Sequence, residues 1–205
     1  MTEQRKEELR EALREATVYV VAHDGLDKAT TKALASRAGV NEGYIYRVFD
    51  GKEDLLAKTF TMLDGELAGA VSQNLPVMHD ESMDIEMRCY KLFLGVWEFL
   101  LSNPDRCLCF IRYYYSPYFQ RYSLHEHEQM FAPATKRFAR VFKEGTDVWR
   151  MLDYMLDAML TSAFRLFRGD FPDTEKTQEE VFTLVYCSVR SHLNWSKQVD
   201  RPTDR

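Results

Sequence analysis

A polar helix face between residues 30 and 56 carries the side chains with the clearest chemical capability in this chain. The face belongs to a short predicted helix that follows Asn41, whose buried side consists of Ile45, Val48 and Phe49. The remaining surface of the helix presents Glu42, Tyr44 and Arg47. Carboxylate, phenol and guanidinium groups form hydrogen bonds with base edges and phosphate oxygens. This polar side is what a DNA groove would meet.

The residues around this face predict a helix-turn-helix followed directly by a longer helix. Thr30 is placed to cap the first helix, which should stop at Gly39 because glycine tolerates the left-handed conformation that ends a helix. Asn41 then caps the second helix. Asp50 and Glu53 fit a capping box at the start of the third helix. Three successive start signals in so short a segment favour a small helical DNA-binding unit.

The motif residues, in chain order, are Thr31, Leu34, Ala35, Ala38, Gly39, Val40, Gly43, Tyr46, Phe49, Lys52 and Leu55. This order resembles the signature of the tetracycline-repressor (TetR) family of transcriptional regulators. A generic helix-turn-helix would share only the small residue, the glycine and the apolar residue after it, so Tyr46, Phe49 and Lys52 narrow the match. The resemblance covers about the first 60 residues, and the remainder of the chain carries no comparable motif.

The resemblance implies roles for individual residues at a DNA interface. Thr31 matches a position that meets a phosphate, and Lys32 one that meets a base edge. In the family, the first turn of the recognition helix faces the bases, and two positions further along the chain contact phosphates. The residues assigned in this way are Glu42, Gly43 and Tyr44 at the bases, and Tyr46 and Lys52 at the phosphates. The missing side chain of Gly43 would let the helix approach the groove closely.

Packing and solvation offer competing interpretations for three of these positions. Glu42 could accept from a cytosine amino group, but the helix dipole equally explains a carboxylate on a first turn. Tyr46 could instead be a half-buried tyrosine of the small domain's core. Arg47 either contacts the DNA backbone or is a solvated charge on the protein surface. Tyr44 departs from the small residue often found at its position, which leaves the base preference open.

Charge does not mark the N-terminal region as a basic module. Residues 1–60 contain 10 Lys and Arg and 11 Asp and Glu, a net charge of −1. The acidic residues concentrate near the N-terminus, often four residues from a Lys or Arg, which predicts internal ion pairs on a solvated face. One such domain with few phosphate contacts should bind weakly, whereas two domains on a palindromic site would double the contacts. The sequence therefore favours a dimer.

The periodicity of the whole chain predicts an all-α fold with two domains. The 205 residues are 45% hydrophobic and 13% aromatic, which is ample for a packed core. We expect a helix-turn-helix DNA-binding domain over 1–51 and a larger helical ligand-binding and dimerisation domain over 52–205. The expected helices beyond residue 51 are 52–74, 83–101, 104–115, 124–144, 147–168 and 175–197. Without a membrane-spanning apolar run or a signal-peptide core, we expect a soluble cytoplasmic protein.

The last two predicted helices, 147–168 and 175–197, resemble an association surface. Apolar residues in 147–168 form a band wider than one core contact requires. Residues 181–195 continue a similar face, and the resemblance implies that these helices pair with their copies in a homodimer. A large monomer core is the competing interpretation.

Aromatic residues in the middle of the chain suggest where a small molecule would act. Such a lining could enclose a flat or apolar ligand, with tyrosine hydroxyls and an arginine fixing its orientation. The candidate ligand-binding residues are Phe93, Trp97, Phe110, Arg112, Tyr113, Tyr114 and Phe164. Core packing is the competing interpretation for each of them. The resemblance implies an inducer site here without choosing its residues.

Metal, cofactor and catalytic chemistry find little support. His125 and His127 are two residues apart, so on one helix they point in different directions and should both lie at the surface. The cysteines Cys89, Cys107, Cys109 and Cys187 lie in apolar helical stretches, which predicts reduced, buried thiols. No phosphate-cradling loop or nucleophile elbow is present, and we expect neither a cofactor nor an enzymatic activity.

The favoured interpretation is a ligand-responsive regulator that binds double-stranded DNA, a repressor released from its operator by an apolar or aromatic inducer. One alternative replaces the ligand with oxidation of Cys107 or Cys109, since the neighbouring Arg106 and Arg112 would favour a thiolate. A second alternative is a helical protein-interaction module that does not bind DNA.

Overall fold

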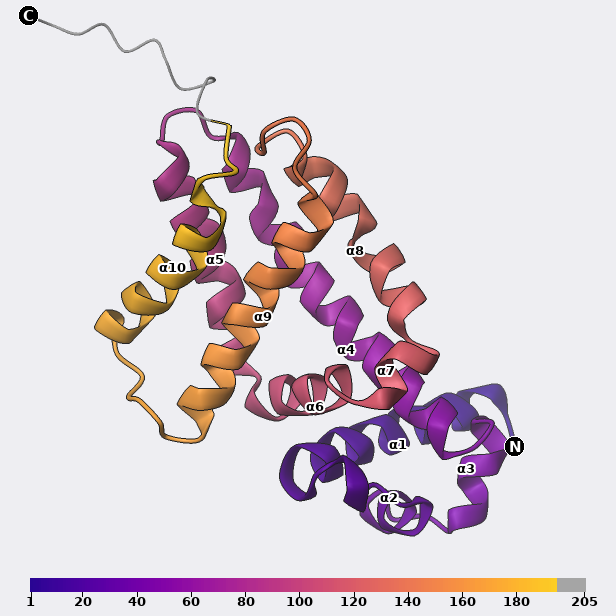
Figure 1. Cartoon of the computed structure of the whole chain (residues 1–205). Coiled ribbons are helices and arrows are strands. Elements are labelled where there is room, and N and C mark those ends of the chain that lie inside the picture. The colour runs from indigo at the N-terminus through magenta and orange to yellow at the C-terminus, as the bar shows by residue number, and fades with distance from the viewer. Residues whose placement is uncertain (195–205) are drawn as a thin grey trace, which may run out of the picture. The chain divides into compact units, whose positions relative to one another are not determined.

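The computed structural model describes residues 1–194, and their secondary structure is helical (Figure 1). No strand occurs in that range, where one antiparallel bridge joins Phe142 and Leu193. The all-α prediction is therefore confirmed. The α-helices are α1 (Glu3–Asp24), α2 (Thr31–Arg37), α3 (Ile45–Val48), α4 (Lys52–Asn74), α5 (Ile85–Ser102), α6 (Pro104–Tyr114), α7 (Pro117–Tyr122), α8 (Leu124–Phe138), α9 (Val148–Phe167) and α10 (Glu175–Arg190). Three 3-10 turns complete the described chain: η1 (Leu26–Lys28), η2 (Glu42–Tyr44) and η3 (Leu75–His79).

The chain divides into two compact units that are not contiguous in sequence. Unit 1 comprises Met1–Glu66 and Asn103–Met130, and unit 2 comprises Leu67–Ser102 and the chain from Phe131 onward. The predicted domain boundary at residue 52 coincides with the first residue of α4, and unit 1 continues beyond it. The functional boundary remains a prediction.

The caps of unit 1 follow the predicted residues with one exception. The Thr30 hydroxyl accepts from the Ala33 amide at 3.2 Å, and the Asn41 side chain accepts from the Gly43 amide at 3.0 Å. Gly39 ends the first motif helix with a φ of 68°. The prediction that Glu53 completes a capping box is wrong, because the carboxylate that accepts from the Asp50 amide, at 3.0 Å, belongs to Asp54.

The core of unit 1 joins α1 to the helix-turn-helix and to α6. Leu13 of α1, Leu34 of α2 and Ile45 of α3 are fully buried, as is Leu55 at the start of α4. Contacts from α1 run to α2, α3 and α6. Each short motif helix is thus held by one or two fully buried aliphatic side chains, which fixes the direction of its exposed side.

Unit 2 packs α5 with α9 and α10, and α9 lies beside α10 (Figure 1). The end of α4 approaches α5 closely at Gly95, where a Cβ atom would overlap the Asn74 side-chain amide. The Asn74 amide is held in place because its nitrogen donates to the Ala70 carbonyl at 2.9 Å. Gly95 is therefore required by packing.

Two predicted helices end early in unit 2. The helix expected over 124–144 stops at Phe138, and the one expected over 175–197 stops at Arg190, with residues 195–197 outside the described range. The reason is a backbone pairing between their ends: Lys143 N donates to His192 O, and Asn194 N donates to Val141 O, both at 2.8 Å. Among residues 1–194 no helix is both long and apolar enough to span a membrane.

Candidate nucleic-acid interface

The second element of the motif consists of η2 followed by α3. Ile45 is fully buried and Phe49 is 6% exposed, so these two residues anchor the element to the rest of unit 1. Glu42, Gly43, Tyr44, Tyr46 and Arg47 are all exposed. The structure therefore places two predicted groups on one accessible surface: Glu42, Gly43 and Tyr44, predicted to face the DNA bases, and Tyr46 and Arg47, predicted to contact the DNA backbone. We call this surface the α3 face.

The two tyrosines of the α3 face resolve one of the competing interpretations. Tyr46 is 63% exposed, so its ring is not part of the core of unit 1. Tyr44 is 37% exposed, and the Arg47 guanidinium carbon lies 4.7 Å from the centre of its ring. A cation stacked on an aromatic ring restricts both side chains. Tyr44 and Arg47 thus form one composite group.

The start of α2 and the start of η2 are joined by a side-chain hydrogen bond. The Thr31 hydroxyl donates to the Glu42 carboxylate. Both residues were predicted at the DNA interface separately, one at a phosphate and one at a base. This hydrogen bond directs the Glu42 carboxylate toward Thr31, a constraint that the helix dipole alone would not supply.

Gly43 is not required by the fold of unit 1. Its φ lies outside the positive range, and an added Cβ would meet Asn41 Oδ1 at 3.5 Å, an ordinary contact distance. Packing in the free protein would therefore accept alanine. The absence of a side chain at this exposed position matters only for something that approaches from outside.

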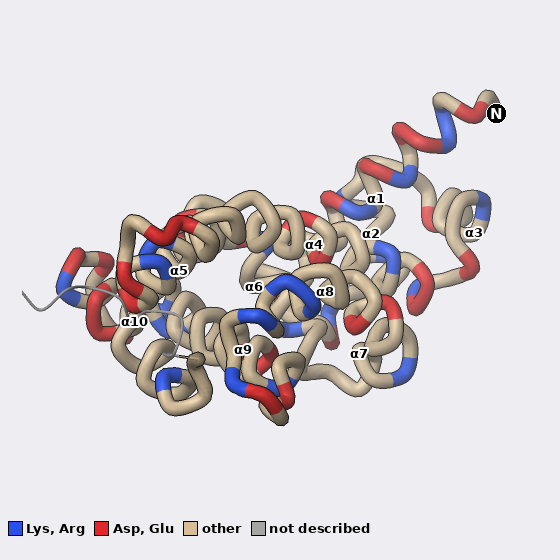
Figure 2. Tube along the Cα trace, turned by 90° about the horizontal axis from the view of Figure 1, so that it is seen from above, with Lys and Arg blue, Asp and Glu red and all other residues tan. Residues whose placement is uncertain are grey.

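The charges of unit 1 are distributed unequally between α1 and the motif. On α1, Arg10 pairs with Glu7 at 3.0 Å, and Arg14 pairs with the same Glu7 at 2.9 Å. Figure 2 shows basic and acidic residues alternating along the N-terminal part of this helix. Lys32 and Arg47, by contrast, form no ion pair within residues 1–194. The near-zero net charge of the region therefore conceals two basic groups that remain available to an anionic partner.

Lys52, the first residue of α4, has a partner that sequence reasoning missed. Its ammonium nitrogen lies 3.4 Å from the Tyr118 hydroxyl oxygen and 5.6 Å from the centre of the Tyr118 ring. The Glu53 carboxylate is 3.9 Å away. Tyr118 lies on α7, 66 residues along the chain, and no local pattern could have indicated the contact.

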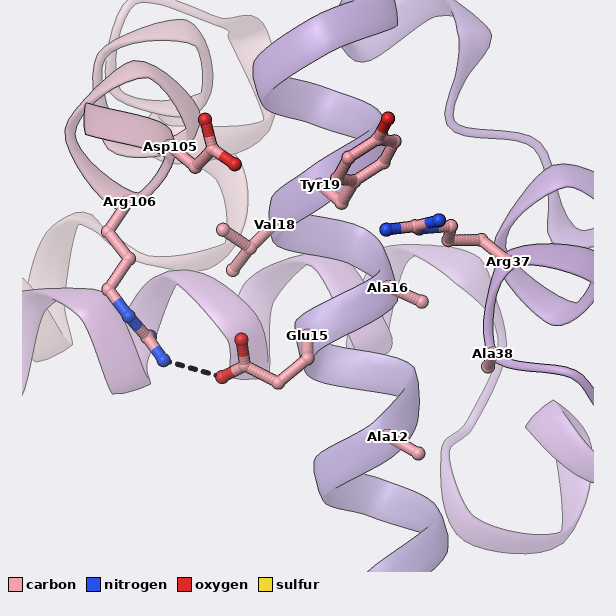
Figure 3. Close-up of a pocket in the computed structure, with 9 residues that line it drawn as sticks. All are labelled: Ala12, Glu15, Ala16, Val18, Tyr19, Arg37, Ala38, Asp105 and Arg106. Atoms are coloured by element: carbon pink, nitrogen blue, oxygen red, sulfur yellow. Dashed lines mark hydrogen bonds and ion pairs between the residues drawn. The ribbon is translucent and has the colours of Figure 1, made fainter. Parts of the chain in front are cut away.

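An open groove of about 580 Å³ runs beside α1, α2 and α6 (Figure 3). The Arg37 guanidinium carbon lies 3.5 Å from the centre of the Tyr19 ring, and Arg106 Nη2 contacts Glu15 at 2.6 Å. Asp105, another wall residue, lies 3.0 Å from a ring nitrogen of His23. None of the seven predicted ligand-binding residues lines this groove.

Four of the predicted ligand-binding residues lie in unit 1 and are engaged there. Tyr113 stacks on Phe60 with ring centres 4.8 Å apart, and Phe110 stacks on Tyr114 at 5.7 Å. The Arg112 guanidinium donates to the Val21 carbonyl at 2.8 Å, so it holds the end of α1. The void beside this cluster is about 10 Å³, enough for about one water molecule.

The other three candidates lie in unit 2. Phe93 and Trp97 of α5 stack with ring centres 5.7 Å apart, and Phe164 of α9 is partly buried. Trp97 is 1% exposed, and its indole N–H has no hydrogen-bond acceptor within the described chain. The predicted set is therefore divided between the units, and its unit 2 members include a buried donor that remains unsatisfied.

The histidine and cysteine predictions hold only in part. His127 is buried rather than at the surface, because its Nδ1 lies 2.8 Å from the buried Asp64 carboxylate. Burial of Asp64 raises the pKa of that carboxyl. Cys187 is exposed, contrary to the prediction that every thiol is buried. Residues 1–194 contain no cluster of three or more potential metal ligands.

The environment of Cys107 and Cys109 does not favour thiolates. Burial raises the pKa of both thiols to about 12. Arg106 is committed to carboxylates, with Glu66 at 3.0 Å and Glu15 closer. Arg112 donates to a backbone carbonyl. The cation effect that motivated a thiol switch is therefore outweighed by desolvation.

A helix-turn-helix with an exposed polar face is typical of helical DNA-binding domains. Residues 13–59 match the model of the bacterial regulatory proteins of the tetR family. Over these residues the chain is similar to this family, and its fold comprises an N-terminal helix-turn-helix followed by a larger helical region.

Two curated relatives are similar over part of the chain. The HTH-type transcriptional regulator BetI of Serratia proteamaculans is 37% identical over 111 residues, which cover 47% of this chain and 56% of the relative. BetI 2 of Chromohalobacter salexigens is 34% identical over 73 residues, which cover 36% of this chain and 35% of the relative. The similarity thus spans about a third to a half of these relatives' length.

Solved structures share the fold over almost the whole chain. A TetR family transcription regulator from Marinobacter aquaeolei VT8 matches with a TM-score of 0.73 and 18% identity, covering 94% of this chain and 100% of the other. The multidrug binding protein EbrR, solved in complex with imidazole, matches with a TM-score of 0.61 and 17% identity, covering 86% and 93%. At these identities the likeness describes the fold.

Proposed function

We propose that this chain is a homodimeric transcriptional regulator of the cytoplasm, a repressor that binds a palindromic DNA operator and releases it when a small inducer binds. The observation that carries the proposal is the α3 face. It presents hydrogen-bonding side chains, among them the Arg47 guanidinium, which has no acidic partner in residues 1–194, on the recognition element of a tetR family domain. A solvated surface with no partner would not require Gly43 or the Thr31–Glu42 contact.

The α3 face supports a division of roles at the DNA. Lys32 and the first turn, Glu42 to Tyr44, would meet base edges, with Glu42 held by the Thr31 hydroxyl as an acceptor for a cytosine amino group. Tyr46, Arg47 and Lys52 would contact phosphates. Thr31 would donate its single hydroxyl proton to a phosphate only by releasing Glu42. This arrangement places few charges at each half-site, so affinity depends on two domains that bind together.

The surface of α9 and α10 supports the homodimer. In unit 2, Leu184 of α10 is 69% exposed and Tyr154 of α9 is 55% exposed. Apolar residues of α9 that remain partly exposed include Val148, Met151, Leu152, Met155, Leu156, Phe164 and Phe167. Exposed apolar side chains gathered on two neighbouring helices support an interaction site, and an isologous contact would bury them in both copies. We call it the α9–α10 face.

Unit 2 supports an apolar or aromatic ligand. The Trp97 indole N–H is buried without an acceptor among the described residues, beside Phe93, which also lies against Phe182 of α10 at 5.5 Å. A ligand with a flat apolar body and one acceptor would satisfy this donor. EbrR, which shares the fold, binds imidazole. An inducer must favour the non-binding state by about 5.5 kcal/mol to change a 99:1 population into 1:99.

A selection of random duplexes with the purified chain tests the proposal without knowledge of operator or inducer. The recovered site is titrated at two salt concentrations with the wild type and with Lys52→Ala. A palindromic consensus whose affinity falls with salt, and falls again in Lys52→Ala, is the expected result. Failure to enrich any sequence, with the protein folded and dimeric, would contradict DNA binding and favour a protein-interaction module.

A further inference from the structure

Tyr118 of α7 contacts the side chain that the proposed function places at a phosphate. The Lys52 ammonium lies 3.4 Å from the Tyr118 hydroxyl, and its distance to the ring centre, 5.6 Å, is within the range of a cation–π contact. Both groups belong to unit 1, and both side chains are partly buried. The contact joins the start of α4 to a helix outside the helix-turn-helix.

The Tyr118 ring is itself held by a column of aromatic side chains. It lies beside Tyr113, with ring centres 6.4 Å apart, and beside Tyr122, with ring centres 6.3 Å apart. Tyr113 is 2% exposed, and its hydroxyl lies 3.0 Å from the Ser123 hydroxyl. A lysine side chain has four rotatable carbon bonds, whereas this tyrosine has two and contacts two neighbouring rings. The contact therefore restricts Lys52 far more than it restricts Tyr118.

The geometry points to Tyr118 as a positioning residue that holds the Lys52 ammonium ready for a DNA phosphate. This inference rests on the proposed function. The hydroxyl oxygen accepts one of the three ammonium N–H groups and leaves two to donate to phosphate oxygens. Tyr118 acts through Lys52 and adds no contact of its own to the bases.

The expected effect follows from the ordering of one flexible side chain. Immobilising such a side chain on binding weakens an interaction by about two- to tenfold, and Tyr118 removes part of that penalty in advance. Each half-site carries one copy, so the effect is expected twice in a dimer. Tyr118→Phe retains the ring and should lose the smaller share, whereas Tyr118→Leu also removes the cation–π contact and should lose more.

The first measurement uses the free protein. In NMR spectra, the side-chain 15Nζ signal of Lys52, assigned by its absence in Lys52→Arg, reports the motion of the ammonium. We expect faster motion in Tyr118→Phe and unchanged motion in the matched control Tyr122→Phe, which removes a hydroxyl from the same short helix. An unchanged Lys52 signal in both Tyr118 variants would overturn the inference whether or not the chain binds DNA.

The second measurement is a double-mutant cycle on the selected duplex. Tyr118→Phe should raise Kd about two- to tenfold per half-site in the wild-type background and have no effect in the Lys52→Ala background. Tyr122→Phe should bind like the wild type in both. An equal loss in the two backgrounds, or tighter binding by Tyr118→Phe, would show that Tyr118 does not act by presenting Lys52.

The two measurements separate the failure of this inference from that of the proposed function. If the wild type selects no duplex while Tyr118→Phe frees the Lys52 ammonium in the free protein, the positioning contact stands and the DNA role is wrong. Thermal unfolding of every variant shows whether a substitution lowers stability. A loss of stability would weaken DNA binding equally in both backgrounds of the cycle, and that equal loss is the outcome that overturns the inference.

Discussion

Tyr46 of α3 and Leu184 of α10 are both large side chains that lie open to solvent, at 63% and 69% exposure, but the surfaces around them differ. The α3 face has a phenol, a carboxylate held by a hydroxyl, and a guanidinium with no acidic partner in residues 1–194. The α9–α10 face is formed by aliphatic, methionine and aromatic side chains. The first surface suits a charged, hydrogen-bonding partner, and the second suits a copy of itself.

The two surfaces are expected to respond differently to mutation and to salt. Contacts between charges and phosphates depend on individual side chains and weaken with salt. Apolar association is much less sensitive to salt, and most single truncations within such an interface cost little, with a few central residues carrying most of the energy.

The largest effect is expected from a charge placed in the α9–α10 face. Leu184 is solvent-exposed in the single chain, so the fold of unit 2 should survive the substitution Leu184→Glu. Burial of the new carboxylate in a dimer interface would be unfavourable. We expect a monomer by analytical ultracentrifugation and a loss of operator affinity of about 100-fold or more, since two domains no longer bind together. A dimer that persists at micromolar concentration would place the dimer interface elsewhere.

A smaller loss should follow removal of one unpaired arginine. Arg47→Gln is expected to weaken operator binding about tenfold and to lower the salt slope by about one per half-site. Arg5→Gln provides the control, because Arg5 pairs with Glu8 at 3.3 Å on α1. Titrations at several salt concentrations should show no change for this control. Equal losses in the two variants would mean that general charge, and not its placement, determines binding.

Two glycine substitutions should separate recognition from packing. Gly43→Ala should leave the free energy of unfolding within about 0.5 kcal/mol and weaken operator binding, because the free protein has room for a Cβ. Gly95→Ala should lower the free energy of unfolding by about 1–3 kcal/mol, since its Cβ would overlap the Asn74 amide. Urea unfolding and DNA titration measure the two quantities. A stability loss in Gly43→Ala would return that glycine to the fold.

Thiol labelling should give the smallest effect and still distinguish the surfaces. Buried Cys107 and Cys109, whose pKa is raised to about 12, should remain unmodified by an alkylating reagent at pH 8 in the native protein. Cys187 lies three residues after Leu184 and is exposed in the single chain. Its rate should be low in the wild-type dimer and higher in Leu184→Glu. Equal rates would show that a second copy does not cover this part of α10.

The helix-turn-helix could be predicted well because its signals are local. Thr30, Gly39 and Asn41 each act on backbone groups within three residues of themselves. The same is true of the helix that was predicted over 52–74, whose limits agree with α4. Glu53 and Asp54 compete for one amide, and the sequence does not show which carboxylate reaches it.

The parts that escaped prediction depend on residues far apart in the chain. His127 is buried because Asp64, on another helix, supplies a partner. The helix that was predicted over 124–144 ends at Phe138 because residues 141–143 pair with residues 192–194. The predicted ligand-binding residues form separate clusters for the same reason, since an aromatic stripe does not reveal which helix will cover it.

The hydrogen bond from Thr31 to Glu42 has a consequence for how the operator preference of this chain would diverge. A change at Glu42 alone leaves the Thr31 hydroxyl without its acceptor, and a change at Thr31 alone releases the carboxylate from its direction. The two positions are therefore expected to vary together among descendants of this protein. A lineage that adopts a new operator would pass through paired substitutions rather than through independent single ones.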